Sequence, residues 1–188
     1  KKAVVAVTQG LWNRLEPHEI EGVLAHELTH VANRDVAVMT IASFFSMVAA
    51  MLARFGLWGG MFSGGDRDRG GAPVWLIMFA VSILTYVISW MLIMMISRYR
   101  EYAADRGAAL ITGAPENLMS ALQKIASRMT QIPQQDLREV SSMNAFFIIP
   151  AGWKKSGAEL FSTHPPLEKR LARLSEIARE MGRPVETF

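Results

Sequence analysis

The chain contains no cysteine among its 188 residues. Disulfide bonds and cysteine-ligated metals are therefore excluded, and any zinc must be held by histidine and carboxylate side chains. No run rich in Lys and Arg with interleaved aromatic residues occurs, so we expect no nucleic-acid partner. The sequence also lacks internal repeats and low-complexity tracts, and its length suffices for one domain with a hydrophobic core.

An initiating methionine and a signal peptide are missing as well. The chain starts at Lys1, from which we expect a processed or truncated chain that has lost something upstream, an additional membrane segment included.

Charged residues are absent from two long stretches, residues 36–53 and 73–97. A helix needs about 20 apolar residues to cross the roughly 30 Å hydrocarbon core of a bilayer. The short polar, glycine-rich stretch at residues 63–71 separates the two. The pattern predicts a transmembrane helical hairpin over residues 36–97, with Arg54 as its one awkward charge. The alternative is a pair of buried core helices, which a chain of this size could hardly surround.

This hairpin divides the rest of the chain into a first part at residues 1–35 and a second part at residues 98–188, which we expect to form one domain. Arg34 precedes the hairpin and Arg98 and Arg100 follow it, whereas the two arginines of the connecting turn are balanced by two aspartates. By the positive-inside rule, both ends of the hairpin, and with them the two parts of this domain, face the cytosol. We therefore expect a multi-pass protein of the cell (inner or plasma) membrane.

Residues 26–30 read His26-Glu27-x-x-His30, the signature of zinc peptidases. On a helix, residues four apart share one face, so both imidazoles can reach one Zn²⁺ while Glu27 is placed to act on water. Pro17 suits the first turn of such a helix. Surface histidines would be the plain alternative. Apolar residues recur at helical spacing and give this helix an apolar face: Ile20, Val23, Leu24, Leu28 and Val31.

A catalytic zinc usually has three protein ligands and one open position. Glu101, just after the hairpin, is the best third ligand because a hairpin brings its two ends together. Asp105 lies four residues on, where it could accept the free N–H of a ligating histidine. The alternative for both acids is a charged helix face paired with Arg98, Arg100 and Arg106.

Together these motifs resemble the M48 family of membrane zinc peptidases, in particular its HtpX branch of membrane quality-control proteases. The resemblance rests on residues 23–30, residues 100–105, the hairpin between them and residues 163–171, which begin Thr163-His164-Pro165-Pro166. It implies a mainly α, gluzincin-like zinc-peptidase domain with a small β element and the inserted hairpin. Residues 3–8, short and rich in valine, are the candidate strand. In such peptidases an edge strand pairs with the substrate backbone.

Three further residues receive roles by this resemblance. His164 is similar in position to a transition-state stabiliser, although a loop histidine capping the next helix is an equal alternative. Arg170 is expected to brace Asp105 or Glu101. Asn144 falls in a segment that resembles a substrate cleft, where it would bind substrate backbone; an ordinary turn asparagine fits as well.

The sequence thus predicts a membrane-embedded endopeptidase with one Zn²⁺ per chain, held by His26, His30 and Glu101, with Glu27 as the proton carrier. The resemblance implies misfolded or damaged membrane proteins as substrates. Two alternatives remain: a non-catalytic, zinc-stabilised membrane scaffold and a prenyl-protein-type peptidase. The lipid bilayer is an expected partner, and the sequence does not predict the oligomeric state.

Overall fold

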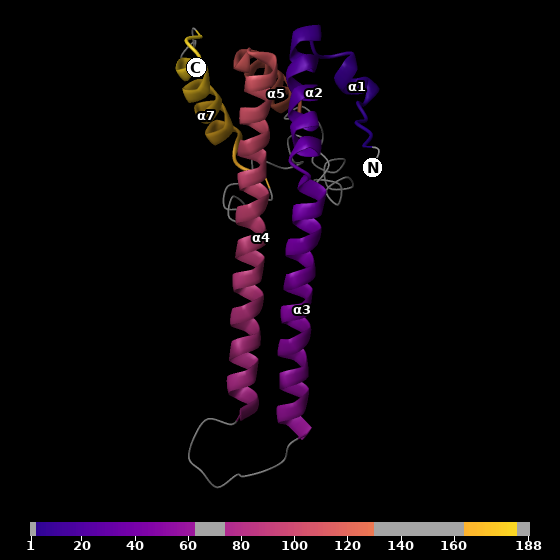
Figure 1. The fold of residues 1–188 in the computed structure, drawn as a ribbon, viewed down its shortest axis with the longest axis vertical. Helices are drawn as coiled ribbons and strands as arrows, with labels where there is room; N and C mark the ends of the chain where they lie inside the picture. The colour runs from indigo at the N-terminus through magenta and orange to yellow at the C-terminus, as the bar shows by residue number, and fades with distance from the viewer. Residues whose placement is uncertain (1–2, 63–73, 130–163, 184–188) are drawn as a thin grey trace. The chain divides into compact units, whose positions relative to one another are not determined.

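The computed structural model describes residues 3–62, 74–129 and 164–183 of the chain (Figure 1). These residues are mainly helical, which confirms the predicted α class. The helices in chain order are α1 (Gln9–Trp12), α2 (Pro17–Ala32), α3 (Asp35–Phe62), α4 (Val74–Thr112), α5 (Pro115–Met129) and α7 (Leu167–Glu180).

The chain divides into two compact units. One comprises Lys1–Asp35 together with Ser97–Phe188, and the other comprises Val36–Ile96. The first unit therefore holds α1, α2, α5, α7 and the C-terminal part of α4, which is one continuous helix through residue 112. All four histidines lie in the first unit.

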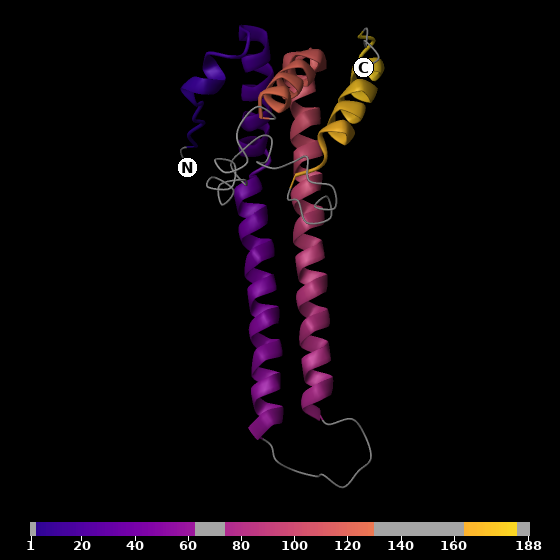
Figure 2. The same cartoon turned by 180° about the vertical axis from the view of Figure 1, so that it is seen from behind.

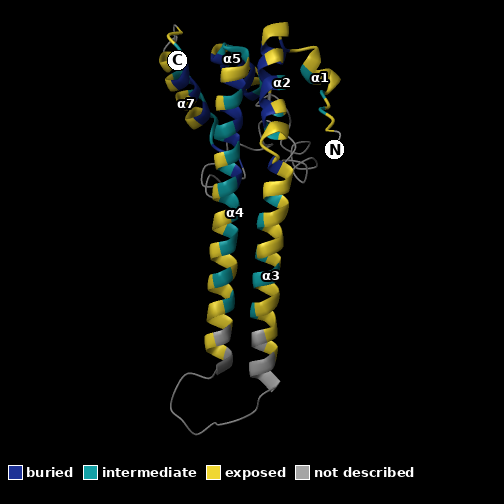
Figure 3. Ribbon diagram, viewed as in Figure 1, coloured by how far each residue is buried: buried dark blue, intermediate teal, exposed yellow. Residues whose placement is uncertain are grey.

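The core of the first unit is apolar and lies where α5 packs on α2 and on α7; the buried positions of these helices are dark blue in Figure 3. Leu118, Leu122 and Leu174 are almost fully buried in this core. At Gly22 the backbones of α2 and α5 come so close that a Cβ atom would lie 2.9 Å from the Leu118 nitrogen. Glycine is thus required there for the two helices to pack.

Helix α2 buries only part of its apolar face: Ile20 and Val23 lie in the core, but the residues nearer its C-terminal end do not. Leu28 and Val31 are 52% and 44% exposed. The buried side instead contains Glu19, His26 and Thr29 among small and apolar residues. The C-terminal end of the apolar face is therefore exposed, because polar residues with specific partners occupy the interior there.

The buried side of α2 meets α4 through a very close contact. A Cβ atom at Gly107 would lie 2.3 Å from Cγ2 and 2.6 Å from Oγ1 of Thr29. The Thr29 hydroxyl donates to the carbonyl of Ala25 at 2.8 Å, which holds this short side chain in place. Since Thr29 directly precedes His30, this contact sets the separation of α2 and α4 beside the histidines.

The second unit contains residues 36–62 of α3 and residues 74–96 of α4, which lie side by side in the opposed views of Figures 1 and 2. Ser82 Oγ donates to the carbonyl of Ala53 at 3.3 Å across this pair. Two helical stretches, Asp35–Phe55 and Phe79–Thr112, are long and apolar enough to cross a membrane.

The apolar side chains of the second unit point outward. Phe45 is 66% and Leu84 60% exposed, and no residue of the most apolar window of either stretch is buried. The hydroxyls of Thr40 and Ser46 donate to backbone carbonyls four residues earlier, so these polar groups are satisfied within the helix. In the described structure these are therefore not the buried core helices of the alternative interpretation.

The predicted β element is not confirmed. Residues 3–8 have no regular secondary structure, and no strand occurs in the ranges that the structure describes. A valine-rich segment becomes a strand only when a second strand supplies hydrogen-bond partners, and the described residues supply none. The turn at residues 63–71 and the segment that contains Asn144 lie outside the described residues.

Candidate metal centre

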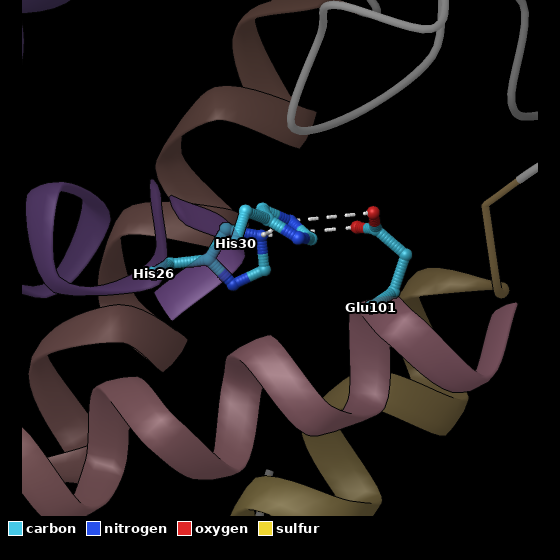
Figure 4. Close-up of side chains that lie close together, drawn as sticks. All are labelled: His26, His30 and Glu101. Atoms are coloured by element: carbon cyan, nitrogen blue, oxygen red, sulfur yellow. Dashed lines mark hydrogen bonds and ion pairs between the residues drawn. The ribbon is translucent and has the colours of Figure 1, made fainter. Parts of the chain in front are cut away.

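Helix α2 supplies the two histidines of the site. Four residues apart, His26 and His30 project from the same side of the helix, and their Nε2 atoms face each other at 3.2 Å (Figure 4). The two rings are nearly perpendicular, at 89°. The His26 side chain is 1% exposed and that of His30 is 18% exposed, so one side of the pair is accessible.

Helix α4 brings Glu101 to this pair. Its Oε1 lies 3.5 Å from His30 Nε2 and its Oε2 lies 3.8 Å from His26 Nε2, and Figure 4 shows the carboxylate turned toward both rings. One donor atom from each of the three residues falls within 4.8 Å of the others. Ligands about 2.0–2.1 Å from one tetrahedral Zn²⁺ lie about 3.3 Å from each other, so this spacing suits a zinc ion.

The environment of the two rings favours a cation between them. Each Nδ1 lies close to an aspartate oxygen: Asp105 Oδ1 at 3.0 Å from His26 and Asp35 Oδ2 at 2.5 Å from His30. A carboxylate there favours the tautomer that carries its proton on Nδ1. Both Nε2 atoms then present lone pairs to each other and to Glu101. A positive charge among these atoms relieves the repulsion of their lone pairs, so the residues present fit a metal ion.

Arg170 of α7 completes the surroundings of the first histidine. Its Nε and Nη2 donate to the two carboxylate oxygens of Asp105 at 2.8 and 2.6 Å, and its Nη1 lies 3.8 Å from Glu101 Oε2. The side chain is 2% exposed. Burial alone would lower the pKa of Arg170, but the charge of Asp105 and the hydrogen bonds to it raise the pKa above its usual value. The guanidinium therefore balances the buried acids.

His164 also lies at the cluster, in the turn before α7. Its Nδ1 is 3.1 Å from Glu101 Oε2, and the residue is buried. The N-cap of α7 is Pro166, whose side chain makes no capping hydrogen bond. His164 contacts the same carboxylate that faces the two rings.

Glu27 follows His26 in α2 and is half-buried. Its charge contributes to the raised pKa of Arg170, after those of Asp105 and Glu101. Glu27 therefore belongs to the same electrostatic environment as the cluster. Asn144, the remaining predicted site residue, lies outside the described residues.

Sequence reasoning missed two residues of this site. Asp35 begins α3 and contacts His30, and Arg100 Nε lies 3.0 Å from Asp35 Oδ2. The sequence offers Arg100 as a partner of Glu101 or Asp105, whereas Asp105 pairs with Arg170 and Arg100 contacts Asp35. The available signal was an aspartate five residues after the second histidine, directly after the helix-ending pair Asn33-Arg34.

Comparison with known proteins adds to this geometry. Residues 1–178 match the model of peptidase family M48. The chain belongs to this family. Membership of M48 implies a metal ion, and the cluster of His26, His30 and Glu101 is where the described residues could hold one.

Individual M48 relatives are similar over nearly the whole chain. The protein named Protease HtpX homolog 2 of Methanosarcina acetivorans is 56% identical over 182 residues, 96% of this chain and 61% of that protein. Protease HtpX homolog of Moorella thermoacetica is 53% identical over 180 residues, 95% of this chain and 60% of the relative. Protease HtpX homolog 1 of Streptomyces coelicolor is 49% identical over 181 residues, 96% and 59% respectively.

The M48 chain thus spans about three fifths of the length of these curated relatives. No solved structure matches it.

Proposed function

We propose that this chain is the catalytic part of a membrane-embedded, zinc-dependent endopeptidase. One observation carries the proposal: in an M48 chain, two histidines and a glutamate present donor atoms within 4.8 Å of one another. His26, His30 and Glu101 would hold one Zn²⁺. A cysteine-free set of two imidazoles and one carboxylate is a known ligand set of catalytic zinc.

When bound, zinc supplies Lewis acidity, which lowers the pKa of a coordinated water to about 7 and polarises the scissile carbonyl. Glu27 takes the proton from the attacking water and delivers it to the leaving amine. Asp105, supported by Arg170, keeps the proton of His26 on Nδ1 so that Nε2 is free to bind metal.

His164 stabilises the negative charge that develops on the substrate oxygen. Its place beside Glu101, within the same buried cluster, supports this role. Asn144 is proposed to bind the substrate backbone, as the family resemblance suggests.

The proposed substrates are misfolded or damaged proteins, membrane proteins above all, in a quality-control role. The relatives are named as HtpX proteases, and residues 36–97 contain the two helical stretches apolar enough for a bilayer-spanning hairpin. Residues 1–35 and 98–188 then form the catalytic domain on the cytosolic side of the cell membrane.

Cleavage of an unfolded protein tests this proposal. The purified chain in detergent should degrade casein, a strong zinc chelator should stop the reaction, and added Zn²⁺ should restore it. Glu27→Ala should retain one zinc per chain and lose cleavage, since it removes the proton carrier but no ligand. Glu101→Ala should lose zinc by elemental analysis. Full cleavage by the Glu27 variant, or full zinc content in the Glu101 variant, would contradict the assigned roles.

A non-catalytic scaffold is the competing function. A structural zinc site is closed by four protein ligands, whereas the cluster among the described residues has three members. A scaffold would bind zinc and leave casein intact in every variant. No observation favours a prenyl-protein peptidase, which would need a large chamber within the membrane.

A further inference from the structure

We propose that Asp35 is a positioning residue of this site, which orients His30 for the metal, and that Arg100 holds Asp35 in place. The inference rests on the proposed zinc peptidase function. It concerns the second histidine, whose Nδ1 contacts Asp35, a residue outside the two sequence motifs.

The contacts form a chain from the site outward. Asp35 Oδ2 lies 2.5 Å from His30 Nδ1 and 3.0 Å from Arg100 Nε. The Asp35 side chain is 5% exposed, so its carboxylate faces these partners rather than water. A buried carboxylate at Nδ1 favours the tautomer that turns the lone pair of Nε2 toward the metal site, and it fixes the plane of the ring.

The first histidine has the same arrangement. His26 contacts Asp105, and Asp105 is bound by Arg170. Each of the two histidine rings therefore contacts an aspartate, and each aspartate contacts an arginine. The two aspartate–arginine pairs come from different segments of the chain. Such carboxylate–histidine pairs orient metal ligands in many zinc sites.

The backbone between His30 and Asp35 is bent to make this contact. Arg34 has φ = 54°, which makes it the only non-glycine residue with positive φ among the described residues. This conformation costs a residue with a side chain about 1–2 kcal/mol. The left-handed residue ends the turn after α2 and puts Asp35 against the histidine five positions earlier. A strained backbone at a site is typical where geometry serves function.

Asp35 also begins α3, where an acidic side chain favours the helix start. The test must separate this local role from the orientation of His30. Asp35→Asn retains a good residue for a helix start and a hydrogen-bond acceptor but removes the charge, whereas Asp35→Ala removes both.

Zinc affinity, measured by competition with a chelator on the purified chain in detergent, is the first readout. Asp35→Asn should bind zinc about 10-fold and Asp35→Ala up to about 100-fold more weakly than the original chain. Arg100→Gln should weaken binding in the same direction. Glu21→Gln and Arg106→Gln, exposed residues on α2 and α4, are the matched controls and should leave affinity unchanged.

Cobalt is the second readout, because the visible spectrum of bound Co²⁺ reports ligand geometry. We expect an altered spectrum in Asp35→Asn and Arg100→Gln and the original spectrum in both controls. Unchanged zinc affinity and spectrum in Asp35→Asn and Asp35→Ala, with or without a fall in stability of the metal-free protein, would overturn the inference. Failure of the original chain to bind zinc or cleave casein would instead overturn the proposed function.

Discussion

At the scale of single residues, each acidic side chain of the site lies next to a basic one. Glu101, Asp105 and Arg170 are each at most 7% exposed, and no such group is tolerated alone in a protein interior. The carboxylates lie against imidazole rings on one side and a guanidinium on another. The rings can therefore present unprotonated nitrogens to a metal while the buried acids stay charged.

Removal of Arg170 should be costly. Arg170→Gln leaves Asp105 with a buried and unbalanced charge, and we expect the metal-free protein to lose about 3–5 kcal/mol of unfolding free energy. Denaturant unfolding in detergent measures this loss. Arg179→Gln, an exposed position on the same helix, should change stability by less than about 0.5 kcal/mol. Equal effects of the two changes would show that the bidentate pair adds no stability.

At the scale of helices, the separation of α2 and α4 decides whether Glu101 reaches the histidines. Thr29 and Gly107 set that separation. A β-branched side chain is stiff at χ1, so Thr29 cannot move aside cheaply if the glycine gains a side chain. This tight contact between α2 and α4 thus lies next to the ligands themselves.

Gly107→Ala should therefore lower both stability, by about 1–3 kcal/mol, and zinc affinity. The double variant Gly107→Ala with Thr29→Ala removes the two atoms that clash most and should recover part of both losses. Gly10→Ala is the control: nothing lies within 4 Å of a Cβ at that glycine, so it should fold and bind zinc normally. Normal zinc affinity in Gly107→Ala would contradict the assigned role of this contact.

Glu19 links α2 to α5 and should make stability depend on pH. Its carboxylate accepts hydrogen bonds from Ser120 and Lys124 at 2.5 and 2.9 Å. It also accepts one from the backbone N–H of Glu16. Burial raises its pKa, but these hydrogen bonds together lower the pKa below the ordinary value of 4.5. The folded state thus releases this proton more readily than the unfolded chain does.

It follows that the stabilisation by Glu19 is complete above a pH of about 4.5 and is lost as the pH falls through the lower folded pKa. The destabilisation caused by Glu19→Gln should stay constant from about pH 8 to pH 5.5 and shrink below about pH 4.5. Thermal unfolding of the metal-free protein across this range measures it, with exposed Glu21→Gln as control. A destabilisation that grows toward low pH would contradict the sign of the shift.

At the scale of the whole molecule, the two compact units differ in which side chains they bury and which they expose. The first has an apolar core and buried charges, while the second exposes large apolar side chains such as Phe44, Phe45 and Leu84. An apolar surface of this extent in water would drive association. The hydrocarbon core of a lipid bilayer is an environment in which such a surface is stable.

The absence of cysteine allows a direct test of membrane orientation. Single cysteines at Asp66 and Glu21 should react with an impermeant maleimide from opposite sides of the membrane. We expect Asp66→Cys to be labelled in right-side-out vesicles and Glu21→Cys only in inside-out ones, since the positive-inside rule places the hairpin ends in the cytosol. The cysteine-free chain gives the background. The opposite pattern would invert the proposed topology.

Much of this protein follows from local sequence patterns. The pair His26 and His30 shares a face because a helix repeats every 3.6 residues, and uncharged runs of residues predict the long helices. The mainly α class was instead expected from the resemblance of the motifs to a known peptidase family. The prediction of Glu101 as a ligand required one further step, namely that a helical hairpin brings its two ends close together.

Other features depended on packing between segments distant in sequence. The burial of His26 and Thr29 in place of Leu28 and Val31, the pairing of Arg170 with Asp105, and the contact of Asp35 with Arg100 are not encoded in any local period. The valine-rich residues 3–8 have strand propensity yet form no strand in the described structure, because a strand needs a partner. Periodicity alone determined which residues share a helix face, whereas tertiary contacts decided which face is buried and which charges meet there, because burial and pairing are properties of neighbours in space.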